Sequence, residues 1–394
     1  MSPIDSRLLV VDDNEDNRYT LTQRLKRQGY TNVSIAVNGR EALVLLREAT
    51  FDLVLLDVMM PELNGYEVLE QIKADERLSH IPVIMISAVD ELESVVRCIE
   101  LGAEDYLAKP FNPTLLRARV GASLEKKRLR DEVRASLNRL ERELDAARRL
   151  QLGMLPREFP VWSAAKPVQV HALMEPAREV GGDLYDFFFA PAHVLCFLVA
   201  DVSGKGADAA MFMARTRSLV RMAIELFQQL GADRASPTSM AQAVNRELCQ
   251  DNRERMFVTL FLGFLDTKTG ALAYMNAGHP LPYLLRASGA IERVAGQPQA
   301  PLGVRNGVVY ESRTVILQPG DAVFACTDGV AEAMNAADEL YTEVRLESDL
   351  RVAHDAAPAE MIRTVKEHVD DFTGTAPKAD DVTMLALRWL PASH

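Results

Sequence analysis

The chain has 394 residues, of which 48% are hydrophobic and 25% charged, and its net charge is −12 at pH 7. These values predict two or three globular domains and exclude wholesale disorder. The acidic balance argues against bulk nucleic-acid binding, so we expect no DNA partner. Four cysteines without a CxxC pair exclude a disulfide scaffold and a structural zinc module. Because no apolar run could span a membrane and no secretory signal is visible, we expect a cytoplasmic protein without a membrane partner.

Short apolar runs alternate with helical patterns up to about residue 110. The runs cover residues 8–11, 53–56, 81–86 and 106–108. Helical patterns follow them, for example at 66–73 and 91–101. Buried strands that alternate with helices predict a doubly wound parallel sheet with helices on both faces. In such a sheet the ligand site lies beyond the carboxyl ends of the strands.

The predicted strand ends carry three carboxylates, a hydroxyl group and a lysine. Asp12, Asp13 and Asp57 offer the oxygen ligands that hold one hard divalent cation such as Mg²⁺. Asp57 can then act as a nucleophile toward a phosphoryl group, while Ser87 and Lys109 bind the phosphoryl oxygens. The alternative, in which each acid only caps the following helix, explains a single aspartate but not five such groups together.

The first 120 residues resemble a response-regulator receiver domain of the CheY type. The resemblance is carried by VVDDNEDN, LVLLDVMMPELNGYEVL, IPVIMISA and GAEDYLAKPF. It implies phosphorylation of one aspartate by a sensor histidine kinase or a phosphotransfer protein. It assigns the phosphoacceptor Asp57, the Mg²⁺ ligands Asp12, Asp13, Asp57 and the carbonyl of Met59, and the switch residues Ser87, Tyr106 and Lys109.

Residues 113–152 are predicted to form one long helix, because only one proline, Pro113 at the first turn, lies among them. Apolar residues recur in this segment at alternating spacings of four and three, which is typical of a coiled coil. We interpret the segment as a parallel coiled coil that makes a homodimer and transmits the state of the receiver. The alternative is a single amphipathic helix lying on one of the domains. The apolar series is Val133, Leu137, Leu140, Leu144 and Ala147.

Residues 153–394 are rich in strand patterns, and four segments that contain aspartate beside glycine or a loop stand out. Asp201 ends an apolar run and precedes a helical pattern at 207–226, whereas Asp328 follows the apolar run 322–326. Asp183 and Asp380 each precede a strand-like segment. Carboxylates without histidine or cysteine favour Mg²⁺ or Mn²⁺, and two such ions can activate water for attack on phosphorus. By spacing alone, a simple turn signal stays an equal alternative.

This third segment resembles a PPM-type serine/threonine phosphatase of the SpoIIE/RsbU branch. The matching stretches are LQLGMLP, EPAREVGGDLYDFF, VADVSGKGADAAMFMA, FVTLFLGFLD, NAGHPLPYLL, APLGV, LQPGDAVFACTDGVAEA and KADDVTMLAL. The resemblance implies an antiparallel β-sandwich with flanking helices and a pair of Mn²⁺ or Mg²⁺ ions. It implies that Asp201 bridges the two ions. Asp183 with the carbonyl of Val202 then completes one ion site, and Asp328 with Asp380 completes the other.

Together the segments predict a response regulator in which phosphorylation controls a phosphatase. The resemblance implies a phosphorylated anti-sigma-factor antagonist as substrate, and it implies that His279 is a supporting residue rather than a ligand. The helix that follows Gly206 is predicted to be a switch element, because it begins next to the expected bridging ligand Asp201. A receiver joined to a PPM-like domain also resembles the RssB adaptor, which delivers the stationary-phase sigma factor to an ATP-dependent protease. In that alternative the third segment is a binding surface for the sigma factor and catalyses no hydrolysis. The four retained acids favour the enzyme.

Overall fold

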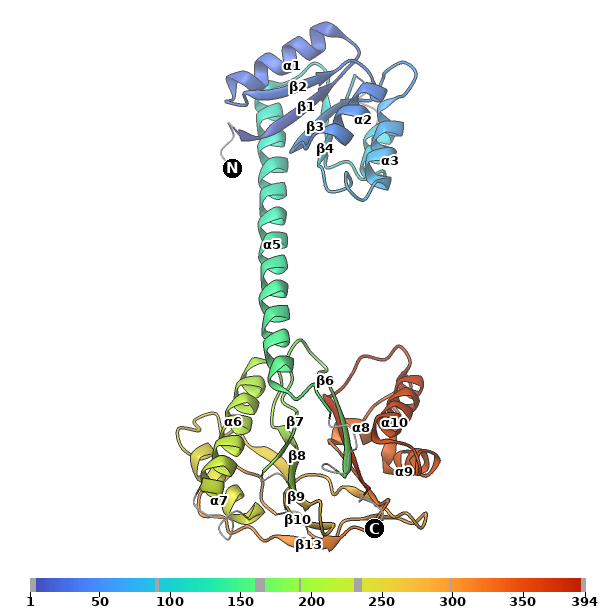
Figure 1. Ribbon diagram of the computed structural model, residues 1–394. Coiled ribbons are helices and arrows are strands. Elements are labelled where there is room, and N and C mark those ends of the chain that lie inside the picture. Colours follow the sequence, from blue (N-terminus) through green and yellow to red (C-terminus); the bar gives the residue numbers. More distant parts are fainter. Residues whose placement is uncertain are drawn as a thin grey trace. The chain divides into compact units, whose positions relative to one another are not determined.

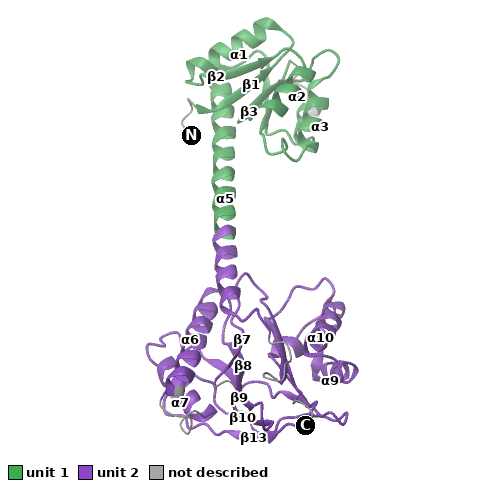
Figure 2. Cartoon of the chain, viewed as in Figure 1, with its two compact units in different colours: residues 1–141 green, residues 142–394 purple. Residues whose placement is uncertain are grey.

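The computed structural model describes residues 5–88, 92–159, 167–190, 193–229, 236–297 and 299–390. The chain divides into two compact units, residues 1–141 and residues 142–394 (Figure 2). The boundary falls within one helix, α5 (Pro113–Met154). Within the described ranges, no helix combines the length and the apolar character that a membrane span requires.

The first unit contains a five-stranded sheet in the order β2-β1-β3-β4-β5, and every pair of neighbouring strands is parallel (Figure 1). Four helices alternate with these strands before α5 begins. The elements are β1 (Arg7–Val11), α1 (Glu15–Arg27), β2 (Asn32–Ala36), α2 (Gly39–Glu48), β3 (Leu53–Asp57), α3 (Gly65–Ala74), β4 (Val83–Ser87), α4 (Leu92–Glu100) and β5 (Asp105–Ala108).

Alternate side chains of the central strands enter two separate cores, one on each face of the sheet. Leu9 and Leu56 pack with α2, α3 and α4, whereas Leu8 and Leu55 pack with α1 and the first turns of α5. Both faces are therefore covered, as the apolar runs predicted. The predicted doubly wound sheet is confirmed. Glu91, where the sequence placed the start of α4, lies outside the described residues.

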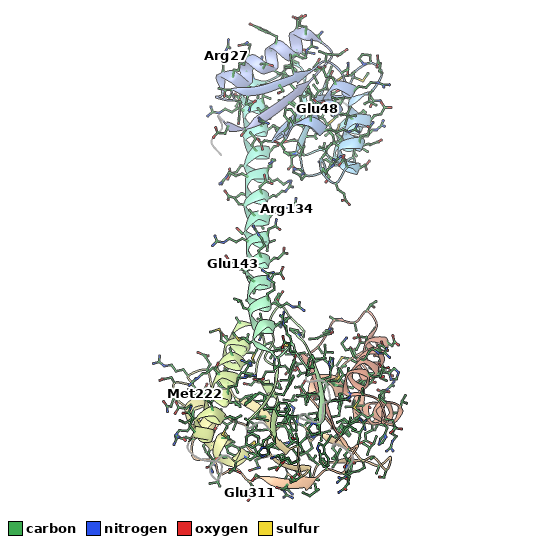
Figure 3. All side chains as sticks on the ribbon, in the orientation of Figure 1. Arg27, Glu48, Arg134, Glu143, Met222 and Glu311 are labelled. Carbon is green, nitrogen blue, oxygen red and sulfur yellow. The ribbon has the colours of Figure 1, made fainter. Side chains whose placement is uncertain are left out.

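The surface of α5 changes from buried to exposed along its length. Leu116 and Val120 are buried against the first unit, whereas the side chains of Val133, Leu137 and Leu140 are each more than half exposed. Figure 3 shows the side chains along this helix, including Arg134, which is exposed. The predicted heptad series thus leaves an apolar stripe uncovered on one copy of the chain.

The second unit consists of two antiparallel five-stranded sheets with flanking helices. The sheet orders are β13-β10-β9-β8-β7 and β12-β11-β14-β15-β6. The strands are β6 (Val168–Glu175), β7 (Leu184–Phe189), β8 (Val194–Val202), β9 (Val258–Asp266), β10 (Ala271–Ala277), β11 (Tyr283–Leu285), β12 (Ile291–Arg293), β13 (Arg313–Ile316), β14 (Ala322–Cys326) and β15 (Val382–Trp389). The helices are α6 (Ala207–Gln229), α7 (Pro237–Leu248), α8 (Asp328–Ala331), α9 (Thr342–Val352) and α10 (Pro358–Thr373).

Residues from the inner faces of both sheets form the larger core of this unit. Leu198 of β8 and Leu385 of β15 belong to it, together with apolar side chains of α6 and α7. The outer face of the second sheet packs against α9 and α10 through residues such as Phe324 and Met384. Successive side chains of a strand point to opposite faces of its sheet, so the strands of the second sheet are buried on both faces. The predicted antiparallel sandwich is confirmed.

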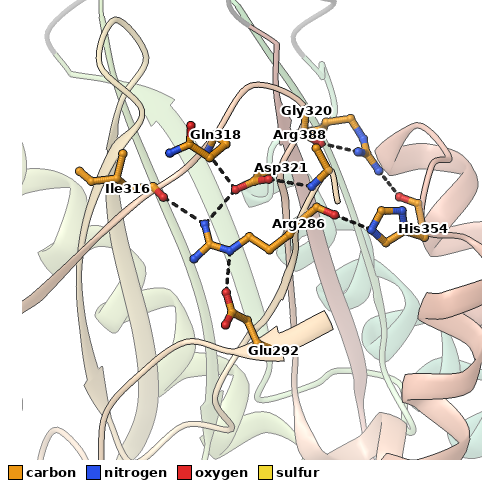
Figure 4. Close-up of polar contacts among 9 residues, drawn as sticks. Arg286, Glu292, Ile316, Gln318, Gly320, Asp321, His354 and Arg388 are labelled. Atoms are coloured by element: carbon orange, nitrogen blue, oxygen red, sulfur yellow. Dashed lines mark hydrogen bonds and ion pairs between the residues drawn. The ribbon is translucent and has the colours of Figure 1, made fainter. Parts of the chain in front are cut away.

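A polar network fixes the far end of the second sheet to the segment between α9 and α10 (Figure 4). Buried Asp321 accepts hydrogen bonds from the Arg286 side chain at 2.9 Å and from the Gln318 backbone N–H at 2.9 Å. Arg388 donates to the carbonyl of Gly320 at 2.6 Å, and His354 Nε2 lies 2.8 Å from the carbonyl of Arg286. Because buried polar groups need partners, this network favours a single sheet register.

Candidate phosphoacceptor and metal sites

Three acids gather at the carboxyl ends of β1 and β3. One carboxylate oxygen from each of Asp12, Asp13 and Asp57 lies within 4.8 Å of the others. Asp12 and Asp57 are buried, whereas Asp13 is exposed. A Cβ atom at Gly65 would lie only 2.2 Å from the carbonyl oxygen of Asp57, so glycine lets α3 start directly behind Asp57. The structure therefore brings these three acids together, as their positions at the strand ends predicted.

Lys109 closes this cluster with two ion pairs. Its Nζ atom lies 2.9 Å from Asp12 Oδ2 and 2.9 Å from Asp57 Oδ1. Ser87 is buried at the end of β4, and Tyr106 is half-buried on β5. The side chain of Met59 is exposed, which leaves only its backbone as a candidate ligand. The structure thus brings Asp12, Asp13, Asp57 and Lys109 together, and Ser87 ends β4, the strand that neighbours β3.

Burial raises the pKa of Asp57 to about 6, although its hydrogen bond with Lys109 acts in the opposite direction. The charges of Asp12 and Asp13 add to the increase. Burial would lower the pKa of Lys109, but its contacts with Asp57 and Asp12 outweigh this effect and raise it. A divalent cation would relieve the repulsion among the three carboxylates, so the donor set fits Mg²⁺.

The four predicted acids of the second unit come from separate elements that the sandwich brings to one end. Asp183 directly precedes β7, and Asp201 is the penultimate residue of β8. Asp328 opens α8 two residues after the end of β14, and Asp380 lies two residues before β15. The N-cap residue Thr327 does not cap α8 with its hydroxyl, which instead donates to Asp183 Oδ2 at 2.8 Å.

The pKa values show that these acids influence one another. Burial and the charge of Asp201 raise the pKa of Asp183 well above its usual range. Partial burial, followed by the charges of Asp328 and Asp380, raises the pKa of Asp201 to about 7. Partial burial and the charge of Asp380 also raise the pKa of Asp328. Asp201 therefore interacts with Asp183 as well as with Asp328 and Asp380.

Two further residues complete the cluster and were not assigned a role from the sequence. Lys205 Nζ pairs with Asp380 Oδ2 at 2.9 Å and donates to the carbonyl of Ala379 at 2.6 Å. Asp381 accepts hydrogen bonds from the backbone N–H groups of Ala177 and Gly182, each at 2.7 Å. The motifs KADD and SGKG contain both residues, but neither motif alone distinguishes a ligand from a supporting residue.

Glycines allow the segments around the acids to approach closely. A Cβ atom at Gly329 would lie 1.9 Å from the carbonyl oxygen of Asp381. A Cβ atom at Gly182 would lie 2.9 Å from the carbonyl oxygen of Val202, the predicted backbone ligand. Real Cβ atoms do not tolerate such distances, so these positions require glycine for packing rather than for unusual backbone angles.

His279 is buried, and Thr259 Oγ1 lies 2.9 Å from its Nδ1. Its backbone N–H donates to the Asn276 side chain at 2.8 Å. Burial lowers the pKa of His279 to about 3, so its ring is neutral at physiological pH. These contacts connect His279 to Thr259 of β9 and Asn276 of β10.

The donor chemistry of the second cluster fits hard cations. It consists of carboxylate oxygens and nearby backbone carbonyls, and the acids raise one another's pKa values. Among the described residues, only the receiver acids place three ligand atoms within 4.8 Å of one another. The described acids of the second unit do not form such a compact group of three ligand atoms.

Comparisons with known proteins agree with this division of the chain. The family model described as Stage II sporulation protein E (SpoIIE) matches residues 191–390, which is half of the chain. The model of the response regulator receiver domain matches residues 8–121. Protein IcfG of Synechocystis sp. is 29% identical over 276 residues, covering 65% of this chain and 42% of that protein. The probable transcriptional regulator ycf27 of Cyanidium caldarium is 44% identical over 119 residues, covering 30% of this chain and 46% of that protein.

The chain thus spans less than half the length of these curated relatives. Among solved structures, the SiaA-PP2C domain of Pseudomonas aeruginosa matches with a TM-score of 0.55 and 20% identity. The match covers 64% of this chain and 98% of that domain, which establishes a shared fold for the second unit.

Proposed function

Because the chain belongs to the Stage II sporulation protein E (SpoIIE) family and carries a response regulator receiver domain, we propose that it is a phosphorylation-controlled protein phosphatase. Its second unit hydrolyses phosphoserine or phosphothreonine in a partner protein. The observation that carries this proposal is the cluster of Asp183, Asp201, Asp328 and Asp380, whose mutual repulsion a pair of hard cations would relieve.

In the receiver, Asp57 is the proposed phosphoacceptor. Its carboxylate attacks the phosphorus of a phosphohistidine in a sensor histidine kinase or phosphotransfer protein, an acyl phosphate forms and the histidine leaves. Lys109 already contacts Asp57 and can transfer one of its contacts to a phosphoryl oxygen. Asp12, Asp13, Asp57 and the carbonyl of Met59 would hold Mg²⁺, which neutralises developing charge when bound.

In the second unit, Asp201 is the proposed bridging ligand of two Mn²⁺ or Mg²⁺ ions. Asp183 and the carbonyl of Val202 would complete one ion site, and Asp328 and Asp380 the other. When bound, the ions would supply Lewis acidity and a water nucleophile. Thr327 fixes the orientation of Asp183 through its hydroxyl group, while Lys205 holds Asp380 at the edge of the site.

The proposed substrate is a phosphorylated anti-sigma-factor antagonist, and the output is control of a sigma factor in the cytoplasm. We further propose that two copies of the chain associate through the uncovered stripe of α5. Val133, Leu137 and Leu140 recur at heptad spacing on this stripe and are more than half exposed in one copy. A parallel coiled coil would bury them and would connect the two receivers to the two phosphatase units.

The RssB-like adaptor, in which the second unit only presents the stationary-phase sigma factor to a protease, is not favoured. A binding module has no need for a cluster of acids whose ionisation costs free energy. Sigma-factor binding that persists after loss of the acid cluster, without any hydrolysis in the parent chain, would support this alternative.

The direct test is Asp328→Asn in the full chain. Phosphate release from a phosphoserine peptide in Mn²⁺ should fall by at least about a hundredfold, because one ligand charge is lost while the side-chain shape is kept. Asp338→Asn is the matched control, since Asp338 is exposed and its positive φ of 60° suits asparagine. Retention of the parental rate by Asp328→Asn would contradict the site assignment. Beryllofluoride, which mimics the Asp57 phosphoryl group, then tests the regulation.

A further inference from the structure

Near its end, α5 buries one side chain, that of Gln151, beside the loop that carries Asp183, whereas Leu150 and Met154 on the same turns are exposed. Gln151 is 5% exposed although glutamine is usually a surface residue. Its Nε2 donates to the carbonyl of Gly181 at 2.5 Å, and its Oε1 accepts from the backbone N–H of Gly181 at 3.1 Å. Both polar atoms of the Gln151 side chain therefore form hydrogen bonds with a single glycine that lies thirty residues away in sequence.

Gly181 is enclosed from the opposite side by the segment that precedes β15. A Cβ atom at Gly181 would lie 2.5 Å from Asp381 Oδ2. The same Oδ2 accepts from the N–H of Gly182 at 2.7 Å and lies 3.5 Å from the N of Asp183. The loop is thus held between Gln151 on one side and Asp381 on the other, and its last residue is a proposed metal ligand.

The end of α5 is itself fixed in the core of the second unit. Leu155 is buried, and Leu152 packs against the same core. Tyr185, two residues after Asp183, donates its hydroxyl hydrogen to the carbonyl of Pro156 at 2.9 Å. The helix end and the metal-ligand loop therefore form one connected group of contacts, and a displacement of the helix end must either move the loop or break the hydrogen bonds of Gln151.

We propose that Gln151 is a positioning residue for the metal site, whose amide holds the 180–183 loop against the end of α5 and so sets the cation affinity of Asp183. The inference rests on the proposed function, because it assigns a means of regulation to the same site. It makes the linker helix a direct structural neighbour of the phosphatase site, so a change at this helix end alters metal affinity before it alters the chemical step. Residues that orient metal ligands from outside typically change affinity by about 10- to 100-fold when replaced.

The test uses the full chain carrying Asp13→Asn, which weakens cation binding by the receiver so that the Mn²⁺ counted belongs to the second unit. Mn²⁺ binding is titrated without substrate from the electron paramagnetic resonance signal of free Mn²⁺. Gln151→Met keeps the size of the side chain but removes both hydrogen bonds, and should weaken binding by about tenfold. Gln151→Glu keeps one hydrogen-bond acceptor, so its Mn²⁺ affinity should lie between the affinities of the parent and of Gln151→Met. Gln242→Met, at an exposed glutamine of α7, should bind as the parent does.

A second readout separates positioning from general stability. With p-nitrophenyl phosphate, Gln151→Met should require about tenfold more Mn²⁺ for half-maximal rate but reach the parental rate at saturation. Unchanged Mn²⁺ affinity in a folded Gln151→Met chain, with only a lower melting temperature, would overturn the inference. If Gln151→Met does not fold, parental affinity in Gln151→Glu overturns it. A parent chain that binds no Mn²⁺ would instead refute the proposed function.

Discussion

Replacing Asp57 by asparagine should stabilise the receiver at alkaline pH, because the folded chain buries a carboxylate that carries a cost when ionised. Burial raises the pKa of Asp57 from 3.8 to about 6. Between these two pH values the unfolded chain loses the proton while the folded chain keeps it. The stability that the protonated group supplies is therefore complete below pH 3.8 and is lost as the pH rises through about 6.

The magnitude follows from the difference between the two pKa values. At about 1.4 kcal/mol for each pKa unit, the ionised carboxylate costs about 3 kcal/mol at pH 8 and only about 1 kcal/mol at pH 4.5. An asparagine side chain at this position would be neutral at both pH values and would avoid this cost. The attraction of Lys109, 2.9 Å from Asp57 Oδ1, is already part of the net pKa and needs no separate correction.

Hydrogen–deuterium exchange of β1 and β3 in the full chain measures this effect, with EDTA present to remove cations. Asp57→Asn should slow the exchange of these strands by about a hundredfold at pH 8 and much less at pH 4.5. Asp75→Asn is the matched control, and it should destabilise the receiver rather than stabilise it. Hydrogen bonds from Arg77 lower the pKa of Asp75, so the ionised form of this carboxylate is favoured in the folded chain. Faster exchange in Asp57→Asn at pH 8 would refute the reasoning.

Three further predictions concern the second unit. Gly329→Ala should weaken Mn²⁺ binding and cost about 1–3 kcal/mol of stability, since its Cβ would lie 1.9 Å from the Asp381 carbonyl. Asp186→Asn should cost about 3 kcal/mol in urea unfolding, because buried Asp186 accepts two 2.6 Å hydrogen bonds from Arg221. Acid should destabilise this unit through His279, whose pKa is lowered to about 3 by burial: the unfolded ring gains a proton below about pH 6.5 and the folded ring does not.

Each of these predictions has a measurement that can contradict it. Parental Mn²⁺ titration by Gly329→Ala would show that the loop shifts at no cost to the site. Urea unfolding of Asp186→Asn is monitored by tryptophan fluorescence. An unchanged midpoint would show that the guanidinium groups of Arg217 and Arg221 become hydrated without a loss of stability. His279→Gln should lose less stability than the parent between pH 7 and pH 4.5, whatever its stability at pH 7. An equal loss in both chains would exclude His279 as the acid-sensitive group.

The sequence by itself determined the order of the elements and the chemistry at their ends. Apolar runs of strand length end at Asp57 and near Asp201. In the first unit, the parallel sheet must bring such strand ends to one edge. The lack of proline after Pro113 indicated the long helix, which the structure places at Pro113–Met154. These are local properties, because side-chain periodicity and turn chemistry depend on residues close together in the chain.

Only the tertiary structure decided which residues of each motif face the acid cluster. Asp380 and Asp381 are adjacent and chemically identical, yet Asp380 pairs with Lys205 while Asp381 accepts from backbone N–H groups of a distant loop. In the sequence, Gln151 does not differ from the other polar residues of the long helix, and only the structure shows its two hydrogen bonds with Gly181. Such assignments depend on strand register and on how two sheets pack, which bring together residues up to about 200 positions apart and leave no periodic trace in the sequence.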